Sequence, residues 1–463
     1  MNTPINGSIS DKYVADVSML PFSIEEYLTR QEKFHSQLPD NSIVIIPSSP
    51  FAKRSNDTNF PYRANSYMLY LCGWKSPDAI FVSSNNSGTW NTSIFVQPND
   101  NLAEIWEGRR IGIDNAMKNW PVDNAYSIEN SIQEIKEVLI KSKNVFIIQG
   151  LNDKLDNLVN VSLTEKSRKR NIEGVGPVII GDPSYIIDEM RLIKSEKEIE
   201  IMQQASDIAS EAHVKAMSKS KLGDGEWNIQ AIIEEYFISN KSRCSYGSIV
   251  GSGSNATILH YNSNDSPIND GDLVLIDAGC EVEGYASDIT RTWPINGTFS
   301  EAQREIYELV LEAELAGINA CRVGAPWKAS HHAASEVLAK GLIALGIIDC
   351  SLDDALGDNF DGPFRNFFMH GTSHSLGLDV HDVGVISPNN EPHGRKLEEG
   401  MILTVEPGLY FAEWRTDISV PSKYAGIGVR IEDDVLITED GPVVLTSSCP
   451  KSVDEIENII QGR

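Results

Sequence analysis

One run of residues near the C-terminal end, 368–382, most constrains what this chain can fold into. It holds three histidines, His370, His374 and His381, in a chain with 9 histidines among 463 residues. Two glycines break the run, so the four-residue spacing of the first two histidines does not require a helix. Histidine is the usual metal ligand and proton carrier near neutral pH. A lone histidine is most often an ordinary surface or core residue, but three together, flanked by isolated acidic residues in apolar strands, predict a site.

Two aspartates, Asp277 and Asp288, lie in apolar stretches upstream of this run. Their surroundings predict two strands around a glycine-containing turn. If the strands pair as a symmetric hairpin centred between Val282 and Glu283, the aspartates are direct cross-strand neighbours with Cβ atoms ~5 Å apart. Like charges in that position destabilise a sheet unless a cation lies between them. The alternatives are that one or both aspartates face water, or that the register is shifted.

Two glutamates downstream repeat the pattern of an acidic residue at the end of an apolar strand. They are Glu406 and Glu432, and each alone is more often solvated than functional. With the two aspartates and His374 they supply four carboxylates and one imidazole, which is too much negative charge for one divalent ion. The set suits two metals ~3.5–4 Å apart that share bridging carboxylates. Oxygen-rich ligands without a thiolate favour Mn²⁺, with Co²⁺, Zn²⁺ or Fe²⁺ as competitors.

The order Asp, Asp, His, Glu, Glu resembles the metallopeptidases of the pita-bread fold. The phrases that carry the resemblance are IDAG at 276–279, SDITR at 287–291, HGTSHSLGLDVHD at 370–382, LTVEPG at 403–408 and VRIED at 429–433. Ser373 and the Leu-Asp-Val-His that follows it resemble the Xaa-Pro aminopeptidases most closely, since dipeptidases more often carry glycine at that position. The resemblance implies that Asp277, Asp288, His374, Glu406 and Glu432 hold two divalent metal ions, with Mn²⁺ favoured.

The resemblance also implies roles for residues around the metals. Glu406 is expected to accept a proton from the water that the metals activate and to return it to the leaving proline nitrogen. The histidines expected to bind the carbonyl oxygen and orient the substrate are His260, His370 and His381. Arg430 is expected to hold a carboxylate ligand, or else to form a plain buried salt bridge. Tyr410 either packs or donates a hydrogen bond in the pocket.

An α+β fold with two domains is expected from the length and the pattern of elements. The sequence predicts that residues 1–175 form an α/β domain. The expected strands are 43–46, 79–82, 93–96 and 145–148, and the expected helices are one capped at Ser23 and another at 129–142. Residues 188–463 are expected to form a twofold repeat of two helices followed by two strands. Capping boxes at Ser195 and Ser300 begin the first helix of each half, and the second helices are expected at 226–239 and 327–345. The resemblance implies that this second domain is a pita-bread fold with pseudo-two-fold halves, behind a creatinase-type N-terminal domain.

The N-terminal phrases at 60–74 and 103–110 resemble that creatinase-type domain. In aminopeptidases P it takes part in oligomerisation, so the resemblance implies a homo-oligomer, a dimer or tetramer. Trp106, Arg109 and Arg110 are then expected at a subunit contact near an active site. The alternative for Trp106 is ordinary packing within one chain.

The expected function is hydrolysis of the bond between an N-terminal residue and a following proline, in peptide substrates. The nearest alternative is a dipeptidase that acts on Xaa-Pro dipeptides. Comparing the turnover of tripeptides with that of dipeptides separates the two activities. A non-catalytic binding protein and a metal-free creatine-type hydrolase on the same fold are further alternatives, and the complete set of five ligands disfavours both.

Composition limits the partners. The formal net charge of −27 argues against nucleic acid and anionic membranes, which need a basic surface. The 6 cysteines lack Cys-x-x-Cys spacing and do not form the framework of a small disulfide-rich protein. Residues 1–20 show no cationic start and no apolar stretch, so we expect no secretory or transit signal and a cytoplasmic location.

Overall fold

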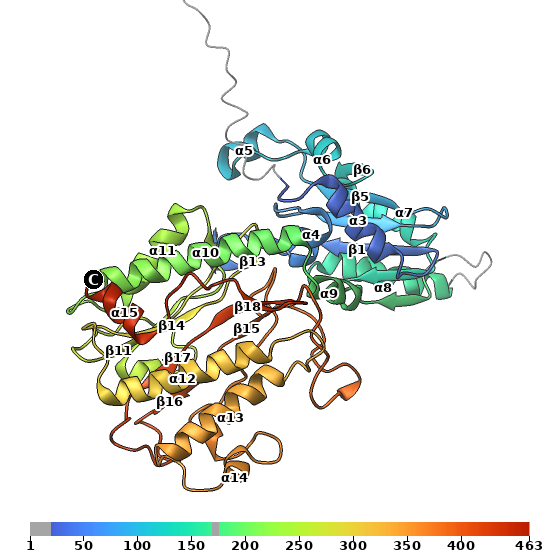
Figure 1. The fold of residues 1–463 in the computed structure, drawn as a ribbon. Helices are drawn as coiled ribbons and strands as arrows, with labels where there is room; N and C mark the ends of the chain where they lie inside the picture. The colour runs from blue at the N-terminus through green and yellow to red at the C-terminus, as the bar shows by residue number, and fades with distance from the viewer. Residues whose placement is uncertain (1–19, 169–175, 463) are drawn as a thin grey trace, which may run out of the picture. The chain divides into compact units, whose positions relative to one another are not determined.

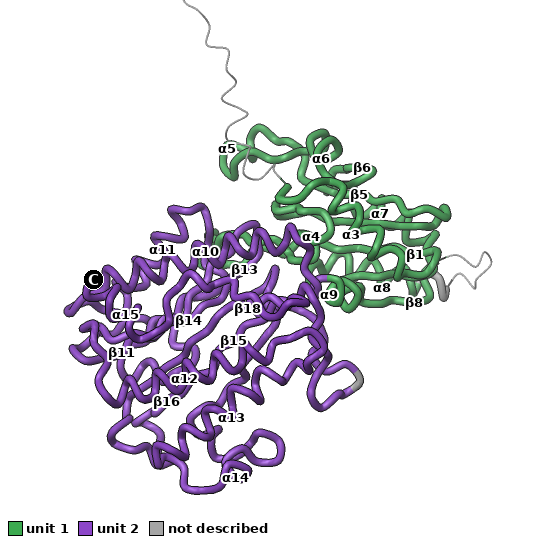
Figure 2. Tube along the Cα trace, viewed as in Figure 1, with its two compact units in different colours: residues 1–190 green, residues 191–463 purple. Residues whose placement is uncertain are grey.

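The computed structural model describes residues 20–168 and 176–462 (Figure 1). The chain divides into two compact units, Met1–Met190 and Arg191–Arg463 (Figure 2). The division falls just after residue 188, where the second domain is predicted to begin. Among the described residues, no helix is both long enough and apolar enough to cross a membrane.

The first unit is built on one mixed six-stranded sheet. Its strand order is β6-β5-β4-β1-β7-β8, with bounds β6 Asn124–Ser127, β5 Asn91–Val96, β4 Ile80–Ser84, β1 Ser42–Pro47, β7 Asn144–Ile147 and β8 Ile179–Gly181. The four central strands are the four that the sequence predicts. The two edge strands were not predicted, because both are short and only partly buried, so neither carries an apolar run.

Helices precede, connect and follow these strands in the chain. They are α3 Ile24–His35, α4 Ser66–Cys72, α5 Asn101–Glu107, α6 Ile113–Asn119, α7 Ser131–Leu139, α8 Asp153–Arg168 and α9 Ser184–Leu192. The predicted cap is confirmed, since the Ser23 hydroxyl accepts a hydrogen bond from the backbone N–H of Glu26 over 3.2 Å. The helix predicted over 129–142 is shorter than expected, because Ile128–Asn130 form a separate 3₁₀ turn, η1, before α7.

Helix α5 buries none of its residues. Leu102, Ile105 and Trp106 are 75%, 75% and 88% exposed, and their spacing puts them on one face of the helix. The alternative that Trp106 packs within one chain is therefore wrong. Arg110 folds back onto its own loop, where it pairs with Glu107 at 3.1 Å.

The second unit contains the predicted repeat of two helices followed by strands. Its first half opens with α10 Glu196–Lys219 and α11 Glu226–Ser239, and its second half opens with α12 Glu301–Ala320 and α13 Ala329–Ala344. The capping boxes at Ser195 and Ser300 are both present. A short helix α14, Leu352–Leu356, and the C-terminal α15, Val453–Ile460, complete the helices of the unit.

Small antiparallel sheets follow each helix pair. The first half has β10 Ile249–Ser252, β11 Leu273–Asp277 and β14 Thr290–Pro294 in one sheet, and β9 Arg243–Cys244, β12 Cys280–Val282 and β13 Tyr285–Ala286 in another. The second half has β15 Ile402–Val405, β18 Asp433–Thr438 and β19 Gly441–Val444 in one sheet, and β16 Gly408–Tyr410 and β17 Gly428–Arg430 in another. An isolated bridge between Thr290 and Glu432 joins the two halves.

The register of the aspartate strands differs from the symmetric hairpin that the sequence suggests. Asp277 pairs with Thr290, not with Asp288. The turn explains the shift, because Glu283 and Gly284 both have positive φ, 54° and 89°, as a two-residue type I′ turn requires. The hairpin is thus centred one residue later than expected, between Glu283 and Gly284. Asp288 precedes Thr290 by two residues, so it still lies on the same face as Asp277.

Candidate metal centre

One cavity of about 250 Å³ in the second unit collects the predicted site residues. It is lined by Leu259, His260, Asp277, Asp288, His370, Gly371, Ser373, His374, His381, Glu406, Arg430 and Glu432. All five predicted ligands, the three pocket histidines and Arg430 are therefore brought together. They arrive from strand ends and adjoining loops of both halves, which fixes their backbones before any ligand binds.

The tightest cluster of possible ligand atoms belongs to Asp288, His374 and Glu432. One ligand atom from each lies within 4.8 Å of the others. The Nε2 atom of His374 is 3.3 Å from a carboxylate oxygen of Asp288 and 3.7 Å from one of Glu406. Its Nδ1 lies 3.0 Å from the carbonyl oxygen of Ser375. A proton on Nδ1 donated to that carbonyl leaves Nε2 unprotonated and free to bind a metal ion.

Asp277 lies outside this cluster but lines the same cavity. Its carboxylate accepts a hydrogen bond from Nη2 of the buried Arg430 over 2.6 Å. The phenol oxygen of Tyr246 lies 2.5 Å from Asp277 and 2.5 Å from Asp288. One phenolic proton serves only one of these carboxylates at a time, so the neutral Tyr246 adds no positive charge, and Arg430 supplies that charge to Asp277. No motif in the sequence marks Tyr246, which lies in the loop before β10.

The carboxylates are held in an unfavourable state without a cation. Burial, followed by the repulsion of neighbouring carboxylates, raises the pKa of Glu432 well above its ordinary value. Burial also raises the pKa of Glu406, to about 7, although His374 and Arg430 oppose the rise. Burial alone would lower the pKa of His374, but its hydrogen bond to Asp288 and the nearby carboxylates raise it to about 9. Four carboxylates, of which Asp288 and Glu432 are buried and Asp277 and Glu406 partly buried, fit a site for divalent metal ions.

The pocket histidines have different surroundings. His370 is hydrogen-bonded through Nε2 to the hydroxyl of Tyr410 at 2.8 Å, and its Nδ1 lies 3.6 Å from Glu406. Burial, together with Arg430, lowers the pKa of His370 to about 3, so this ring is neutral at physiological pH. Of the two expectations for Tyr410, the hydrogen-bonding one is confirmed, since Arg430 also donates to its hydroxyl over 3.0 Å.

His260 and His381 lie at the exposed side of the cavity. The ring of His381 is perpendicular to that of His374, with centroids 4.4 Å apart. The loop that carries His381 is fixed by its neighbour Asp382, which pairs with Arg191 at 2.5 Å and with Lys194 at 3.2 Å. Gly377 allows this closure, because a Cβ there would lie 2.1 Å from a carboxylate oxygen of Asp382.

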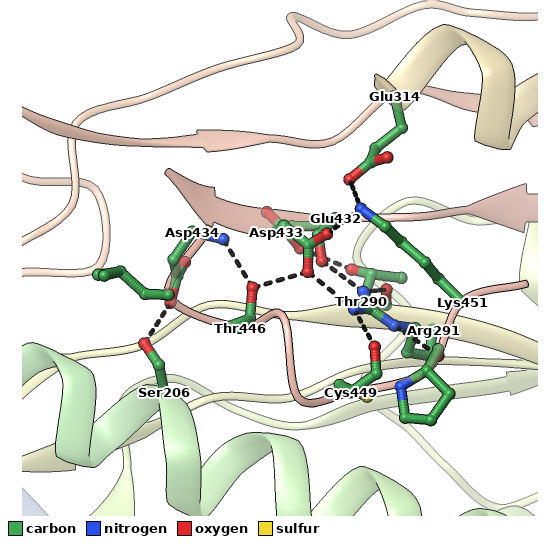
Figure 3. A network of polar contacts seen from close by, with 12 residues as sticks. Ser206, Thr290, Arg291, Glu314, Glu432, Asp433, Asp434, Thr446, Cys449 and Lys451 are labelled. Carbon is green, nitrogen blue, oxygen red and sulfur yellow. Dashed lines mark hydrogen bonds and ion pairs between the residues drawn. The ribbon is translucent and has the colours of Figure 1, made fainter. Parts of the chain in front are cut away.

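A buried polar network lies behind Glu432 (Figure 3). Thr290 donates its hydroxyl to the carboxylate of Glu432 over 2.7 Å, and Arg291 donates to the Glu432 backbone carbonyl over 2.6 Å. Arg291 also pairs with the buried Asp433 at 2.7 Å. Lys451 bridges Asp433 and Glu314 at 2.5 and 2.6 Å. The network ties the C-terminal segment and α12 to the strand that presents Glu432.

Asp434 extends this network toward the other half. Its carboxylate accepts a hydrogen bond from the hydroxyl of Ser206 at 3.0 Å (Figure 3). It also accepts one from the backbone N–H of Asp288 at 3.2 Å. Ser206 belongs to α10, so this contact anchors a helix of the first half against β18 of the second. Asp288 and Glu432 are thus each positioned by contacts that cross between the halves.

Comparison with known proteins agrees with this geometry. The sequence profile described as "Metallopeptidase family M24" matches residues 200–439, and that described as "Aminopeptidase P, N-terminal domain" matches residues 27–147. The chain belongs to metallopeptidase family M24. The predicted pita-bread fold with a creatinase-type N-terminal domain is confirmed, and as an M24 metallopeptidase the chain binds divalent metal ions.

Proteins similar to this M24 chain include an Xaa-Pro aminopeptidase of Haemophilus influenzae. It is 41% identical over 437 residues, which are 94% of this chain and 97% of that protein. Among solved structures, aminopeptidase P from Escherichia coli with the inhibitor Pro-Leu has a TM-score of 0.89 at 40% identity, covering 95% of this chain and 99% of that one. Aminopeptidase PepP of Pseudomonas aeruginosa has a TM-score of 0.89 at 37% identity, covering 96% and 99%. Family and relatives together make this chain a metal-dependent aminopeptidase.

Proposed function

We propose that the chain is an Xaa-Pro aminopeptidase, which hydrolyses the bond between an N-terminal residue and a following proline. The observation that carries this proposal is the convergence of four carboxylates and His374 from both halves on one cavity, with three further histidines around it. The likeness to an aminopeptidase P that was solved with the inhibitor Pro-Leu supports the choice of proline substrates.

Asp277, Asp288, His374, Glu406 and Glu432 are proposed to hold two divalent ions, with Mn²⁺ favoured by the oxygen-rich donors. When bound, such a pair lowers the pKa of water toward neutrality and polarises the scissile carbonyl. The four carboxylates offer enough negative charge to balance two ions. Arg430, which pairs with Asp277 at 2.6 Å, orients that carboxylate and partly offsets the charge of the group.

Glu406 is proposed as the general base and then the general acid. It takes the proton of the attacking water and returns it to the proline nitrogen as the peptide bond breaks. His370 is held by Tyr410 and by the carbonyl of Gly371, which fixes its ring beside Glu406 in the proposed substrate pocket. His260 and His381, at the exposed side, bind the substrate's carbonyl oxygen and align its backbone. The proline nitrogen carries no hydrogen, and the ring fixes φ. A suitable pocket therefore needs neither a hydrogen bond from that nitrogen nor rotation about φ.

The decisive experiment uses protein stripped of metal by a chelator and an Xaa-Pro-Pro tripeptide. We expect no cleavage by the stripped protein and restored release of the N-terminal residue when Mn²⁺ is added back. An Xaa-Pro dipeptide, assayed in parallel, separates the aminopeptidase from a dipeptidase. Failure to release the N-terminal residue from the tripeptide under any divalent metal would refute the proposal.

A homo-oligomer, a dimer or tetramer, is also proposed. Its support is the exposed apolar face of α5, formed by Leu102, Ile105 and Trp106, because a contiguous apolar surface of this kind usually marks a contact. A cytoplasmic location is likewise proposed.

A further inference from the structure

An exposed tryptophan lies in the connection between the two short strands that flank the metal centre. Residues 411–427 join β16 to β17, and these strands supply Tyr410 and Arg430 to the site. Trp414, in this connection, has a side chain that is 59% exposed. Neither the metal centre nor the buried network uses this residue.

Two anchors fix the position of Trp414. Its indole N–H donates to the hydroxyl of the buried Thr257 over 3.3 Å, and that hydroxyl donates to the carbonyl of Ser254 over 2.7 Å. The next residue, Arg415, donates to the carbonyl of Asn366 over 2.9 Å. The ring is therefore held in place although more than half of its surface faces solvent.

Both anchors belong to segments that run directly into the cavity. Thr257 is three residues before His260, and Asn366 is four residues before His370. Since an extended chain covers at most ~3.6 Å per residue, each anchor lies within roughly 11–14 Å of a histidine of the site. Between Thr257 and His260 lie Ile258, which is 41% exposed, and Leu259, which lines the cavity. Two apolar residues thus lie in the chain between the cavity histidine and the residue that anchors the indole.

We propose that Trp414, with Ile258, binds the part of a peptide substrate that follows the proline and so favours longer peptides with an apolar residue there. This inference rests on the proposed aminopeptidase function. An enzyme that removes one N-terminal residue encloses only the first residues of its substrate, and the rest of the chain must leave across the rim. An extended peptide advances ~3.3 Å per residue, so its second and third residues after the proline are ~7–10 Å further on, within the span allowed between the anchors and the histidines.

The test compares two substrates, an Xaa-Pro-Ala tripeptide and an Xaa-Pro-Ala-Leu-Ala pentapeptide, in the metal-loaded full chain. For Trp414→Ala we expect the ratio of pentapeptide to tripeptide kcat/KM to fall about tenfold, mainly through KM, because an apolar contact is lost. Trp414→Phe keeps most of the apolar face and should restore most of the ratio. Thr257→Val removes the indole's hydrogen-bond partner and should give an intermediate ratio.

Trp227→Ala is the matched control, since Trp227 is an exposed tryptophan at the start of α11 that packs over Gly225. It should leave the ratio unchanged. An unchanged ratio in Trp414→Ala, or a ratio lowered as much by Trp227→Ala, would overturn the inference. A change of oligomeric state in Trp414→Ala, measured by light scattering, would also overturn it and make this surface a subunit contact. Failure of the wild-type chain on both peptides would instead reject the proposed function.

Discussion

The hydroxyl of Thr290 lies 2.7 Å from a carboxylate oxygen of Glu432, and it also accepts a hydrogen bond from Nε of Arg430 over 3.1 Å. One side chain of β14 thereby sets the orientation of a proposed ligand that comes from the other half of the unit. Such contacts to ligands fix ligand geometry, and their loss typically costs ~10–100-fold in metal affinity or activity.

Thr290→Val keeps the shape of this side chain and removes its hydroxyl. We therefore expect metal affinity to fall about 10–100-fold, while the metal-free protein keeps its secondary structure. Titration calorimetry with Mn²⁺ measures the affinity, and Thr290→Ser is the control that should restore it. Wild-type affinity in Thr290→Val would show that the hydroxyl does not position Glu432.

Asp288 is proposed to serve both metals, so Asp288→Asn should reduce the metal content from two ions per chain to one. The amide keeps the size of the carboxylate but loses the charge that balances two cations. Elemental analysis of dialysed protein gives the stoichiometry. A full pair of metals in this variant contradicts the assignment.

His370 and His381 are placed around the metals and not among the ligands. We expect His370→Ala and His381→Ala to retain metal but to lose about 10²–10⁴-fold in kcat/KM, as removal of one proton-handling or polarising group does. Metal content and kinetics are measured on the same preparations. If metal is lost in proportion to activity, the division into ligand and pocket histidines is wrong.

Trp106 is the largest side chain of the exposed face of α5, so Trp106→Ala should weaken the proposed oligomer. Size-exclusion chromatography with light scattering should show a smaller species, with the metal content of the second unit unchanged. Met117→Ala, at an exposed apolar residue of α6, is the control. A wild-type chain that is monomeric and fully active refutes the oligomer proposal.

We expect the stability of the first unit to depend on pH because of His35. It is buried, stacks on Trp90 with centroids 4.1 Å apart, and burial lowers its pKa from 6.5 to about 4. The unfolded chain binds this proton more readily, so stability is lost as pH falls from about 6.5 toward 4, by roughly 3 kcal/mol in all.

The measurement is the melting temperature of the full chain between pH 7.5 and 4.5, compared with that of His35→Gln. The variant lacks the titrating ring, so its melting temperature should fall less steeply with acid than that of the wild type. Parallel curves for the two proteins would mean that His35 carries no proton-linked stability.

The sequence predicted the candidate site better than its surroundings, for physical reasons. Asp277 and Glu432 stand out because charges in apolar strands need partners, and that signal is local. The pairing of Asp277 with Thr290 could not be predicted, because it depends on Glu283 adopting a positive φ that is uncommon for its residue type. Tyr246 was also beyond prediction, because only the folded chain brings its hydroxyl between two aspartates.

The buried network behind Glu432 shows the same limit. Arg291 and Asp433 are far apart in sequence, and neither residue, considered by itself, can be distinguished from an ordinary surface charge. The bridge between Thr290 and Glu432 and the other contacts that join the halves make them neighbours only in the folded chain. Motifs identify the residues that do chemistry, whereas their supports are set by tertiary contacts that carry no local pattern.

The bridge between the two halves also orders events during synthesis. The five proposed ligands span residues 277 to 432, and Glu432 is held by Arg291 from the first half and, through Asp433, by Lys451 near the C-terminus. A nascent chain that has made only the first half has its two aspartates but no imidazole and no glutamates to face them. The set of five proposed ligands is therefore complete only once residue 432 has been made, so a chain that stops before it cannot assemble this centre.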